Sequence, residues 1–344
     1  MSKTGFKIIE WRFDSSKWVR EKIRKIPIIS VFKGVLGHLK IGTGMLVVAQ
    51  KEHQGFMVYD TFIFFNELEL LELRLNELSD VVDRFILVEA TRTFTNKPKP
   101  IYYAENKHLF SKFNHKITHI IVEDSPDSDN PWILDRFQKN CVNRGFNYMS
   151  DNDIIMFSDA DEIPRAAVVK EVINKLKSEN KNSLICDIIH KIYKSEFLIG
   201  LFKHSLRKTN PYVYILEQDL SIYYINMVPK INNKWYGTRI CLYRDFTFAD
   251  EIRYTGYKII KNGGWLFTYM GGIELVRKKL QSFAHSEFNK PEYLDENKII
   301  KSIQNYKFHL NDKTELIQVP LDNRFPKYIL QNKDKYSALI LPEK

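Results

Sequence analysis

Three carboxylates within four positions are the clearest chemical signal in this sequence. They are Asp159, Asp161 and Glu162, in the stretch DIIMFSDADEIPR. Carboxylates this close repel one another, so a fold that keeps them together normally places a cation beside them. On an extended chain Asp159 and Asp161 share a face, and two oxygen ligands on one side suit Mg²⁺ or Mn²⁺. The pair therefore predicts a site where a cation neutralises the charge of a departing diphosphate.

Two other interpretations of this cluster stay open. Asp161 and Glu162 could cap the helix expected just after Pro164, because acidic side chains are favourable at helix starts. An Asp-x-Asp sequence after an apolar strand is also typical of phosphatases that form an aspartyl phosphate. The phosphatase pattern fits poorly, because the residues that follow Asp161 are Glu162, Ile163 and Pro164 instead of a Thr or Val with a nearby glycine.

The elements that must position the cluster alternate between strands and helices. Apolar runs predict strands over residues 57–65, 84–91, 115–124 and 153–163, and leucine or mixed apolar periodicity predicts helices over 66–78, 133–146 and 166–180. This alternation is typical of a mainly parallel α/β sheet, whose sites lie at the carboxyl ends of the strands. The acidic cluster lies at such an end.

The rest of the chain shows a different pattern. Residues 183–260 are rich in Ile, Tyr and Phe and predict a meander of strands with aromatic faces, and residues 274–283 predict a helix. The tail past Asn311 is lysine-rich and is expected to be irregular. We therefore predict a basic N-terminal extension over 1–56, a catalytic domain over 57–310 and a C-terminal tail over 311–344.

Charge is concentrated in the extension. The 344-residue chain carries a net charge of +10, and residues 1–56 hold 11 Lys or Arg against 4 Asp or Glu, which leaves +3 for the remainder. Nucleic-acid binding, which the charge and the 18 Tyr would otherwise favour, therefore rests on the extension alone. Residues 18–40 mix basic and apolar side chains and predict either peripheral contact with a membrane or an extra element packed on the domain.

Cysteine content and hydropathy predict the compartment. The three cysteines, Cys141, Cys186 and Cys241, are isolated and lack the spacing of a metal site. No apolar run reaches the roughly 18–20 residues of a membrane span. The sequence thus predicts a cytoplasmic protein, and peripheral attachment to a membrane through residues 18–40 stays open as an alternative.

Five segments, in the same order along the chain, resemble glycosyltransferase family 17. They are YDTFIFFNELELLELRLNEL, VVDRFILVEATRTFTNKPKP, DIIMFSDADEIPR, NGGWLFTYMGG and QSFAHSEFN, and they extend from about Tyr59 to Asn289. The resemblance implies a GT-A type, Rossmann-like α/β domain. The enzyme would invert the configuration at the anomeric carbon of the transferred sugar and would depend on Mn²⁺ or Mg²⁺. It also implies a UDP-sugar donor, above all UDP-GlcNAc, and a glycan or glycolipid acceptor.

The resemblance also implies roles for individual residues. Asp161 would be the main metal ligand, Asp159 would contact the metal or the ribose, and His285 would complete the metal shell. Glu274 would be the general base, with Glu287 as second choice. Trp265 would stack on a sugar beside a flexible loop of glycines at 263, 264, 271 and 272. Many family members have His directly after this Trp, whereas this chain has Leu266, so contacts with the acceptor are expected to differ.

The nucleotide is expected at the ends of the first strands. The residues there that offer donors and acceptors to uracil, ribose and phosphate are Asn66, Glu67, Glu89, Thr91, Arg92, Lys97 and Arg136. A domain of the same fold that binds glycans without catalysis is the alternative function, and a nucleic-acid-binding protein is a more distant one.

Overall fold

The computed structural model describes residues 6–13, 45–51, 56–147, 149–181, 212–256 and 258–343. The chain forms two compact units, residues 1–55 and residues 56–344. In the first unit, β1 (Phe6–Phe13) pairs antiparallel with β2 (Met45–Lys51). The predicted amphipathic segment 18–40 lies outside the described residues.

The second unit is built on an eight-stranded sheet of order β5-β4-β3-β6-β10-β8-β11-β7. The strands are β3 (Val58–Ile63), β4 (Arg84–Ala90), β5 (Ile117–Val122), β6 (Ile154–Asp159), β7 (Glu162–Pro164), β8 (Tyr214–Ile222), β10 (Lys234–Leu242) and β11 (Lys258–Thr268). The first four strands in the order, β5-β4-β3-β6, pair in parallel, and we call them the parallel half. The other four, β10-β8-β11-β7, combine antiparallel pairs with the parallel pair β8 and β11, and we call them the mixed half. The expected α/β class with a mainly parallel sheet is confirmed for the first half, whereas the pairing of β8 with β11 departs from the expected meander.

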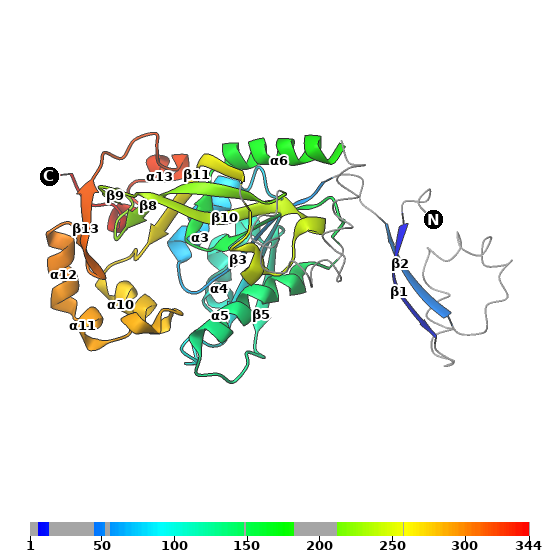
Figure 1. Ribbon diagram of the computed structural model, residues 1–344, viewed down its shortest axis with the longest axis horizontal. Coiled ribbons are helices and arrows are strands. Elements are labelled where there is room, and N and C mark those ends of the chain that lie inside the picture. Colours follow the sequence, from blue (N-terminus) through cyan, green and yellow to red (C-terminus); the bar gives the residue numbers. More distant parts are fainter. Residues whose placement is uncertain are drawn as a thin grey trace, which may run out of the picture. The chain divides into compact units, whose positions relative to one another are not determined.

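Helices cover both faces of this sheet. The α-helices are α3 (Leu68–Leu78), α4 (Tyr102–Asn106), α5 (Pro131–Asn140), α6 (Ala166–Lys181), α9 (Ala249–Ile252), α10 (Ile273–Ser282), α11 (Pro291–Leu294), α12 (Glu296–Gln304) and α13 (Lys327–Gln331). The 3-10 helices are η1 (Lys107–Phe113), η2 (Cys141–Gly145), η4 (Tyr243–Asp245), η5 (Ser286–Phe288) and η6 (Ser337–Leu339). In Figure 1, α6 and α5 lie on opposite sides of the sheet.

Alternating strand residues fill two separate cores, as the two-residue period of a strand requires. On β6, Ile154 and Met156 pack with α3 and α6, whereas Ile155 and Phe157 pack with η2 and α9. Burial on both faces explains the near-continuous apolar run of this strand. Because both faces of β6 are buried, the position and direction of the strand are fixed up to its end at Asp159.

The acidic cluster lies at the junction between the two halves of the sheet. β6 ends at Asp159, and after only two intervening residues the chain enters β7, which pairs with β11 at the opposite edge of the sheet order. The turn Ser158–Glu162 therefore belongs to both halves, and we call it the acidic turn. Helix α6 begins next, and the N–H of Ala166 is accepted by Glu77 at 2.9 Å, so this bond does not use Asp161 or Glu162.

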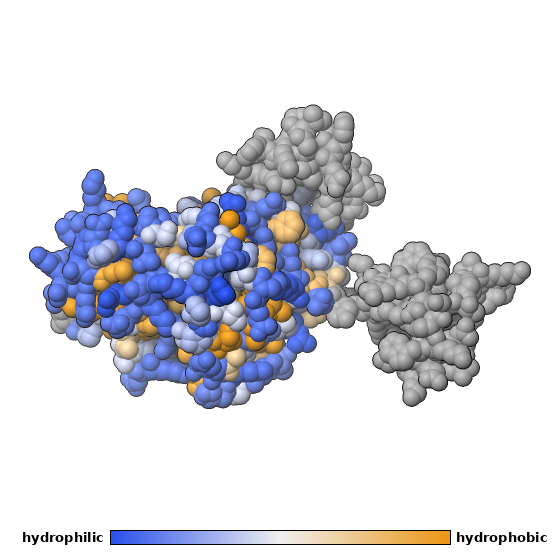
Figure 2. Space-filling view, turned by 90° about the horizontal axis from the view of Figure 1, so that it is seen from below, coloured by the Kyte–Doolittle hydropathy of each residue, from blue (hydrophilic) through white to orange (hydrophobic). Residues whose placement is uncertain are grey.

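The C-terminal residues are ordered, in contrast to the irregular tail expected. Strand β13 (Asn311–Gln318) pairs with β12 (Lys307–Phe308) and β9 (Met227–Pro229), and apolar residues beyond it, including Phe325 and Ile329, are buried. The high lysine content of this segment made these buried apolar residues hard to recognise from the sequence. Figure 2 shows one face of the molecule, where hydrophobic residues form small groups within a mostly hydrophilic surface. Within the described residues, no helix has the length and apolar character needed to cross a membrane.

Candidate active site

A cavity of about 600 Å³ lies where the carboxyl ends of β3, β4 and β6 meet the mixed half of the sheet. This volume is within the usual range of small-molecule sites. Acids and cations share its lining. The acids are Glu67, Asp135, Asp159, Asp161 and Glu162, and the cations are Arg92, Lys99, Lys139, Arg239, Arg253 and Lys279.

Arg74 of α3 fixes the backbone of the acidic turn through hydrogen bonds. Its guanidinium is fully buried and pairs with Asp60 of β3 at 2.6 and 2.7 Å. The same guanidinium donates to the carbonyl oxygens of Asp159 at 2.9 Å and Glu162 at 2.8 Å, and to the hydroxyl of Ser158 at 2.6 Å. Planar donors in a fixed fork make arginine suited to such a role. Arg74 thus sets the backbone from which the carboxylates project.

Asp159 and Glu162 share Arg253, which follows α9. Arg253 donates to Asp159 Oδ2 at 2.9 Å and to Glu162 Oε2 at 2.6 Å, and it also pairs with Glu162 Oε1. Burial alone would raise the pKa of Asp159, but the charges of Arg253 and Lys139 hold this pKa below its usual value. Asp159 therefore stays ionised at neutral pH.

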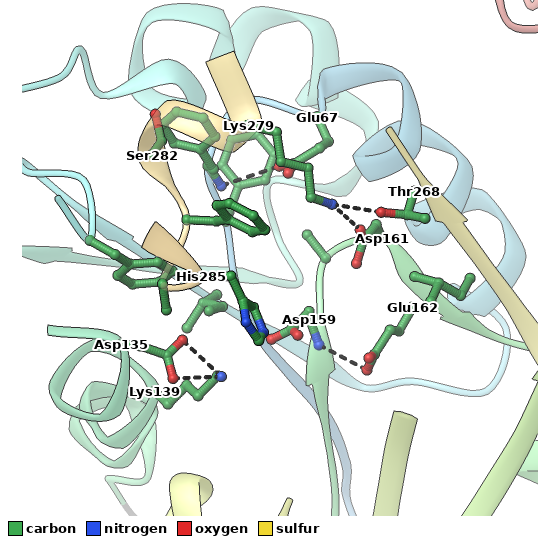
Figure 3. Close-up of a pocket in the computed structure, with 18 of the residues that line it drawn as sticks. Glu67, Asp135, Lys139, Asp159, Asp161, Glu162, Thr268, Lys279, Ser282 and His285 are labelled. Atoms are coloured by element: carbon green, nitrogen blue, oxygen red, sulfur yellow. Dashed lines mark hydrogen bonds and ion pairs between the residues drawn. The ribbon is translucent and has the colours of Figure 1, made fainter. Parts of the chain in front are cut away.

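Asp161 is paired with a different cation. Lys279 of α10 donates to Asp161 Oδ2 at 2.8 Å and to the hydroxyl of Thr268 at 2.9 Å, as Figure 3 shows. Burial raises the pKa of Asp161 to about 6, against the lowering effect of Lys279. Burial would lower the pKa of Lys279, but Asp161 and Glu67 raise it well above its ordinary value. The pKa values of Asp159 and Asp161 are thus shifted in opposite directions.

One atom of the turn is well suited to a metal ion. Asp159 Oδ1 is buried and has no hydrogen-bond partner among the described residues, and Asp161 lies two positions away in the same cavity. An unpartnered buried carboxylate oxygen is costly unless a cation or donor satisfies it. The two carboxylates therefore fit a divalent cation whose other ligands are water and diphosphate. The described residues do not contain a cluster of three or more His, Cys, Asp or Glu that could hold a metal.

His285 lines the cavity, but its ring is engaged elsewhere. Its Nδ1 lies 2.7 Å from Glu287 Oε1, and the ring meets Trp132 edge to face at 4.8 Å. Figure 3 labels His285 together with Asp159, Asp135 and Lys139, which also line the cavity. A role in the metal shell stays a prediction.

The expected nucleotide residues are only partly brought together. Glu67 and Arg92 line the cavity, and Asn66 lines a smaller neighbouring pocket that shares Glu67, Asp161 and Lys279 with it. In the described part of the chain, the lining does not include Glu89, Thr91, Lys97 or Arg136. Glu89 is fully buried, and it accepts bonds from Lys99 at 3.2 Å and from the N–H of Tyr103. It supports the strand ends, so direct contact with a nucleotide does not fit its position.

Four further expectations need correction. Trp265 is only 1% exposed on β11 and donates its indole N–H to the carbonyl of Arg324 at 2.8 Å, so it has no free face for a sugar. The glycines at 263 and 264 lie within β11 and not in a loop; a Cβ at Gly264 would stand 2.1 Å from the carbonyl oxygen of Ile163. The side chain of Glu274 is 81% exposed and pairs with Arg277, outside the cavity lining of the described residues. Glu287, as a base, is likewise outside that lining and is bound to His285.

Sequence reasoning missed the residues that surround the acidic turn. Arg74 stands in a leucine-rich helix and looks like a surface charge, while Arg253 and Lys279 are separated from the turn by about a hundred residues. One signal was available for Arg74. It is the one basic residue within the apolar stripe of α3, where an unpaired charge would be costly.

Comparison with known proteins relates part of this chain to one family of enzymes. Residues 47–212 match the model of Glycosyltransferase family 17. Beta-1,4-mannosyl-glycoprotein 4-beta-N-acetylglucosaminyltransferases from Homo sapiens and Rattus norvegicus are each 28% identical to this chain over 107 residues. Those residues make up 29% of this chain and 20% of each relative, so the similarity spans about a fifth of the relatives' length.

These findings confirm the resemblance to glycosyltransferase family 17 and support a glycosyltransferase enzyme. The family match contains the parallel half of the sheet and the acidic turn. It ends before β8, so Arg253, Lys279 and three strands of the mixed half, β8, β10 and β11, lie outside it, whereas β7 lies within it.

Proposed function

We propose that this protein is an inverting, divalent-cation-dependent glycosyltransferase that transfers GlcNAc from UDP-GlcNAc to a glycan acceptor. The observation that carries the proposal is the acidic turn. It places Asp159 and Asp161 in one cavity at the carboxyl ends of parallel strands, within the segment that matches family 17. Ligands of open α/β sheets bind at this edge.

Asp159 and Asp161 would hold the cation. When bound, the cation would neutralise the negative charge that develops on the departing diphosphate. The protein's own groups prepare this arrangement, since Arg253 keeps Asp159 ionised and Arg74 fixes the backbone of the turn. Lys279 is positioned to exchange its bond to Asp161 for a phosphate oxygen, because both are anionic acceptors of the same ammonium group.

The donor would lie along the parallel half. Arg92 follows β4 and lines the cavity; its Nη1 bonds the amide oxygen of Asn96 at 3.0 Å. No ion pair to this guanidinium is found among the described residues, so Arg92 keeps a positive charge for an anionic ligand. The name of the human and rat relatives describes transfer of N-acetylglucosamine, which supports UDP-GlcNAc as the donor.

The test is calorimetric titration with UDP, with and without Mn²⁺, on the wild type and on Asp161→Asn. Binding that requires Mn²⁺ in the wild type and is lost in the variant is the expected result. Asp80→Asn, which changes an exposed acid after α3, is the matched control and should bind like the wild type. UDP release from UDP-GlcNAc then tests the donor. Equal binding of UDP by the wild type and Asp161→Asn would contradict the proposal.

A further inference from the structure

Three aromatic side chains line the cavity on the side of the mixed half and are exposed. Trp235 and Tyr236 stand at the start of β10 and are 40% and 46% exposed, and Tyr254, just after α9, is 71% exposed. Large aromatic residues with this much exposure inside a cavity are unusual, because burial of their rings is favourable. We call Trp235, Tyr236 and Tyr254 the aromatic wall.

Two members of the wall are held in place. The indole N–H of Trp235 donates to Glu162 Oε1 at 2.6 Å, and the hydroxyl of Tyr236 bonds Glu217 at 3.2 Å. Arg239 supports the backbone beneath them, since it donates to the carbonyl oxygens of Tyr236 and Gly237 at 2.7 Å each. The rings are therefore oriented before any ligand arrives, which lowers the entropic cost of binding one.

The contact between Trp235 and Glu162 connects the wall to the acidic turn. Glu162 is 1% exposed and also accepts from Arg253, which in turn holds Asp159. A ligand stacked on Trp235 would thus lie beside the carboxylates proposed to hold the cation and diphosphate. This is where the sugar that receives the transferred group must be.

The charges of this side favour a neutral ligand. Its two arginines are already used within the protein, Arg253 by carboxylates and Arg239 by three carbonyl oxygens, including that of Thr255 at 2.9 Å. The wall itself offers aromatic carbon and phenol groups. An anionic ligand that loses its hydration here would therefore gain few new interactions with cationic groups. A pyranose has C–H faces that can stack on the aromatic rings and hydroxyls that can bond the phenol groups.

We propose that the aromatic wall is the acceptor subsite and binds a neutral pyranose of the glycan, stacked on Trp235 and Tyr254. This inference rests on the proposed glycosyltransferase function, which it deepens by naming the place and the chemistry of the acceptor. It assigns the donor and the acceptor to different halves of the sheet.

The test measures oligosaccharide binding and UDP binding on the same samples of the full chain. The neutral probes are chitotriose and mannotriose, the anionic probe is a heparin tetrasaccharide, and saturation-transfer NMR with titration gives the affinities. We expect the wild type to bind a neutral probe, and Tyr254→Ala and Trp235→Ala each to weaken this binding about tenfold, with UDP affinity retained.

Two further variants separate stacking from folding. Trp235→Phe removes the bond to Glu162 but keeps a ring, so it should retain most of the oligosaccharide affinity. Phe248→Ala changes an aromatic residue that is 53% exposed but outside the cavity lining of the described residues, and it should bind like the wild type.

Each other outcome overturns the proposal in a recognisable way. Failure of the wild type to bind either neutral probe, unchanged binding in Tyr254→Ala, or binding of the heparin probe alone would each contradict a neutral acceptor subsite. Loss of UDP affinity in both wall variants would assign the wall to the nucleotide. Failure of the proposed function is distinguishable, because then UDP would not bind the wild type while the wall variants could still change oligosaccharide binding.

Discussion

The two halves of the sheet meet at the acidic turn but offer the cavity different kinds of groups. The parallel half contributes Arg92, Lys99 and the pair Asp135 and Lys139, whereas the mixed half contributes the exposed rings of the aromatic wall. The family match covers the parallel half and β7, and it ends before β8, β10 and β11. Under the proposed function, the donor would lie on the parallel half, inside the family match, and the acceptor would lie on strands β8, β10 and β11, outside it.

The largest effect on stability is expected from a substitution of Arg74, which anchors the acidic turn between the two halves of the sheet. Arg74→Met leaves Asp60 as a buried charge without its partner and releases the carbonyl oxygens of the acidic turn. We expect the free energy of unfolding to fall by about 3–5 kcal/mol, as is typical when one member of a buried ion pair is removed. Urea unfolding followed by circular dichroism measures this change.

A double variant separates stability from positioning. Arg74→Met combined with Asp60→Leu removes the uncompensated charge, so part of the lost stability should return. Affinity for UDP with Mn²⁺ should remain weak, because the carbonyl oxygens of Asp159 and Glu162 are still without their donor. Full recovery of UDP affinity in the double variant would show that Arg74 does not position the turn.

A smaller loss of stability is expected when a side chain is added on β10 next to Glu162. A Cβ at Gly237 would stand 2.5 Å from the carboxyl carbon of Glu162 and 2.6 Å from Gln218 Oε1, and both side chains are buried. Gly237→Ala should therefore lower the free energy of unfolding by about 1–3 kcal/mol, as overpacking does. Oligosaccharide binding should weaken with it, since Trp235 is bonded to Glu162.

The matched control for this variant is Lys234→Ala, on the same strand. Lys234 forms an exposed ion pair with Asp219, and such pairs contribute little. A thermal melt and an oligosaccharide titration on both variants make the comparison. Stability of Gly237→Ala equal to that of Lys234→Ala would mean that Glu162 can move without cost, and the proposed link from wall to turn would fail.

Asp159 and Asp161 should respond differently to pH. Because the pKa of Asp161 is raised to about 6, protons compete with a cation for it as the pH falls below that value. Mn²⁺-dependent UDP affinity should decrease as the pH falls through 6, approaching about tenfold per pH unit well below it. Asp159, whose pKa is lowered by Arg253 and Lys139, should not contribute in this range.

Calorimetric titrations at pH 5 to 7.5 measure this dependence, with Mn²⁺-independent binding of UDP recorded in parallel. Asp161→Asn should bind weakly at every pH and show no further loss near 6. If the wild type binds Mn²⁺ and UDP equally well from pH 7.5 down to 5, Asp161 is not a ligand of the cation.

Sequence reasoning anticipated the parallel half because its signals are local. The apolar run before Asp159 and the leucine period of α3 are set by residues a few positions apart, and the structure confirms both elements. The partners of the carboxylates depend on long-range folding: Lys279 reaches Asp161 from α10, and Arg253 reaches Asp159 from beyond α9. Trp265 shows the opposite error, because its aromatic type suggested stacking whereas its place on a doubly covered strand makes it core.

The smallest effect on stability is expected from Arg92→Gln. This variant should change UDP affinity alone, whereas variants of the aromatic wall should change oligosaccharide affinity alone. Arg92 is exposed and makes its described side-chain bond with an amide oxygen, so its loss should leave the free energy of unfolding nearly unchanged. UDP affinity should fall by about threefold to tenfold, because one charge-assisted contact with phosphate is removed at a solvated position. Affinity for the neutral oligosaccharide should stay the same. Tyr254→Ala should give the reverse pattern. Equal losses of both ligands in both variants would mean that donor and acceptor do not divide between the two halves of the sheet.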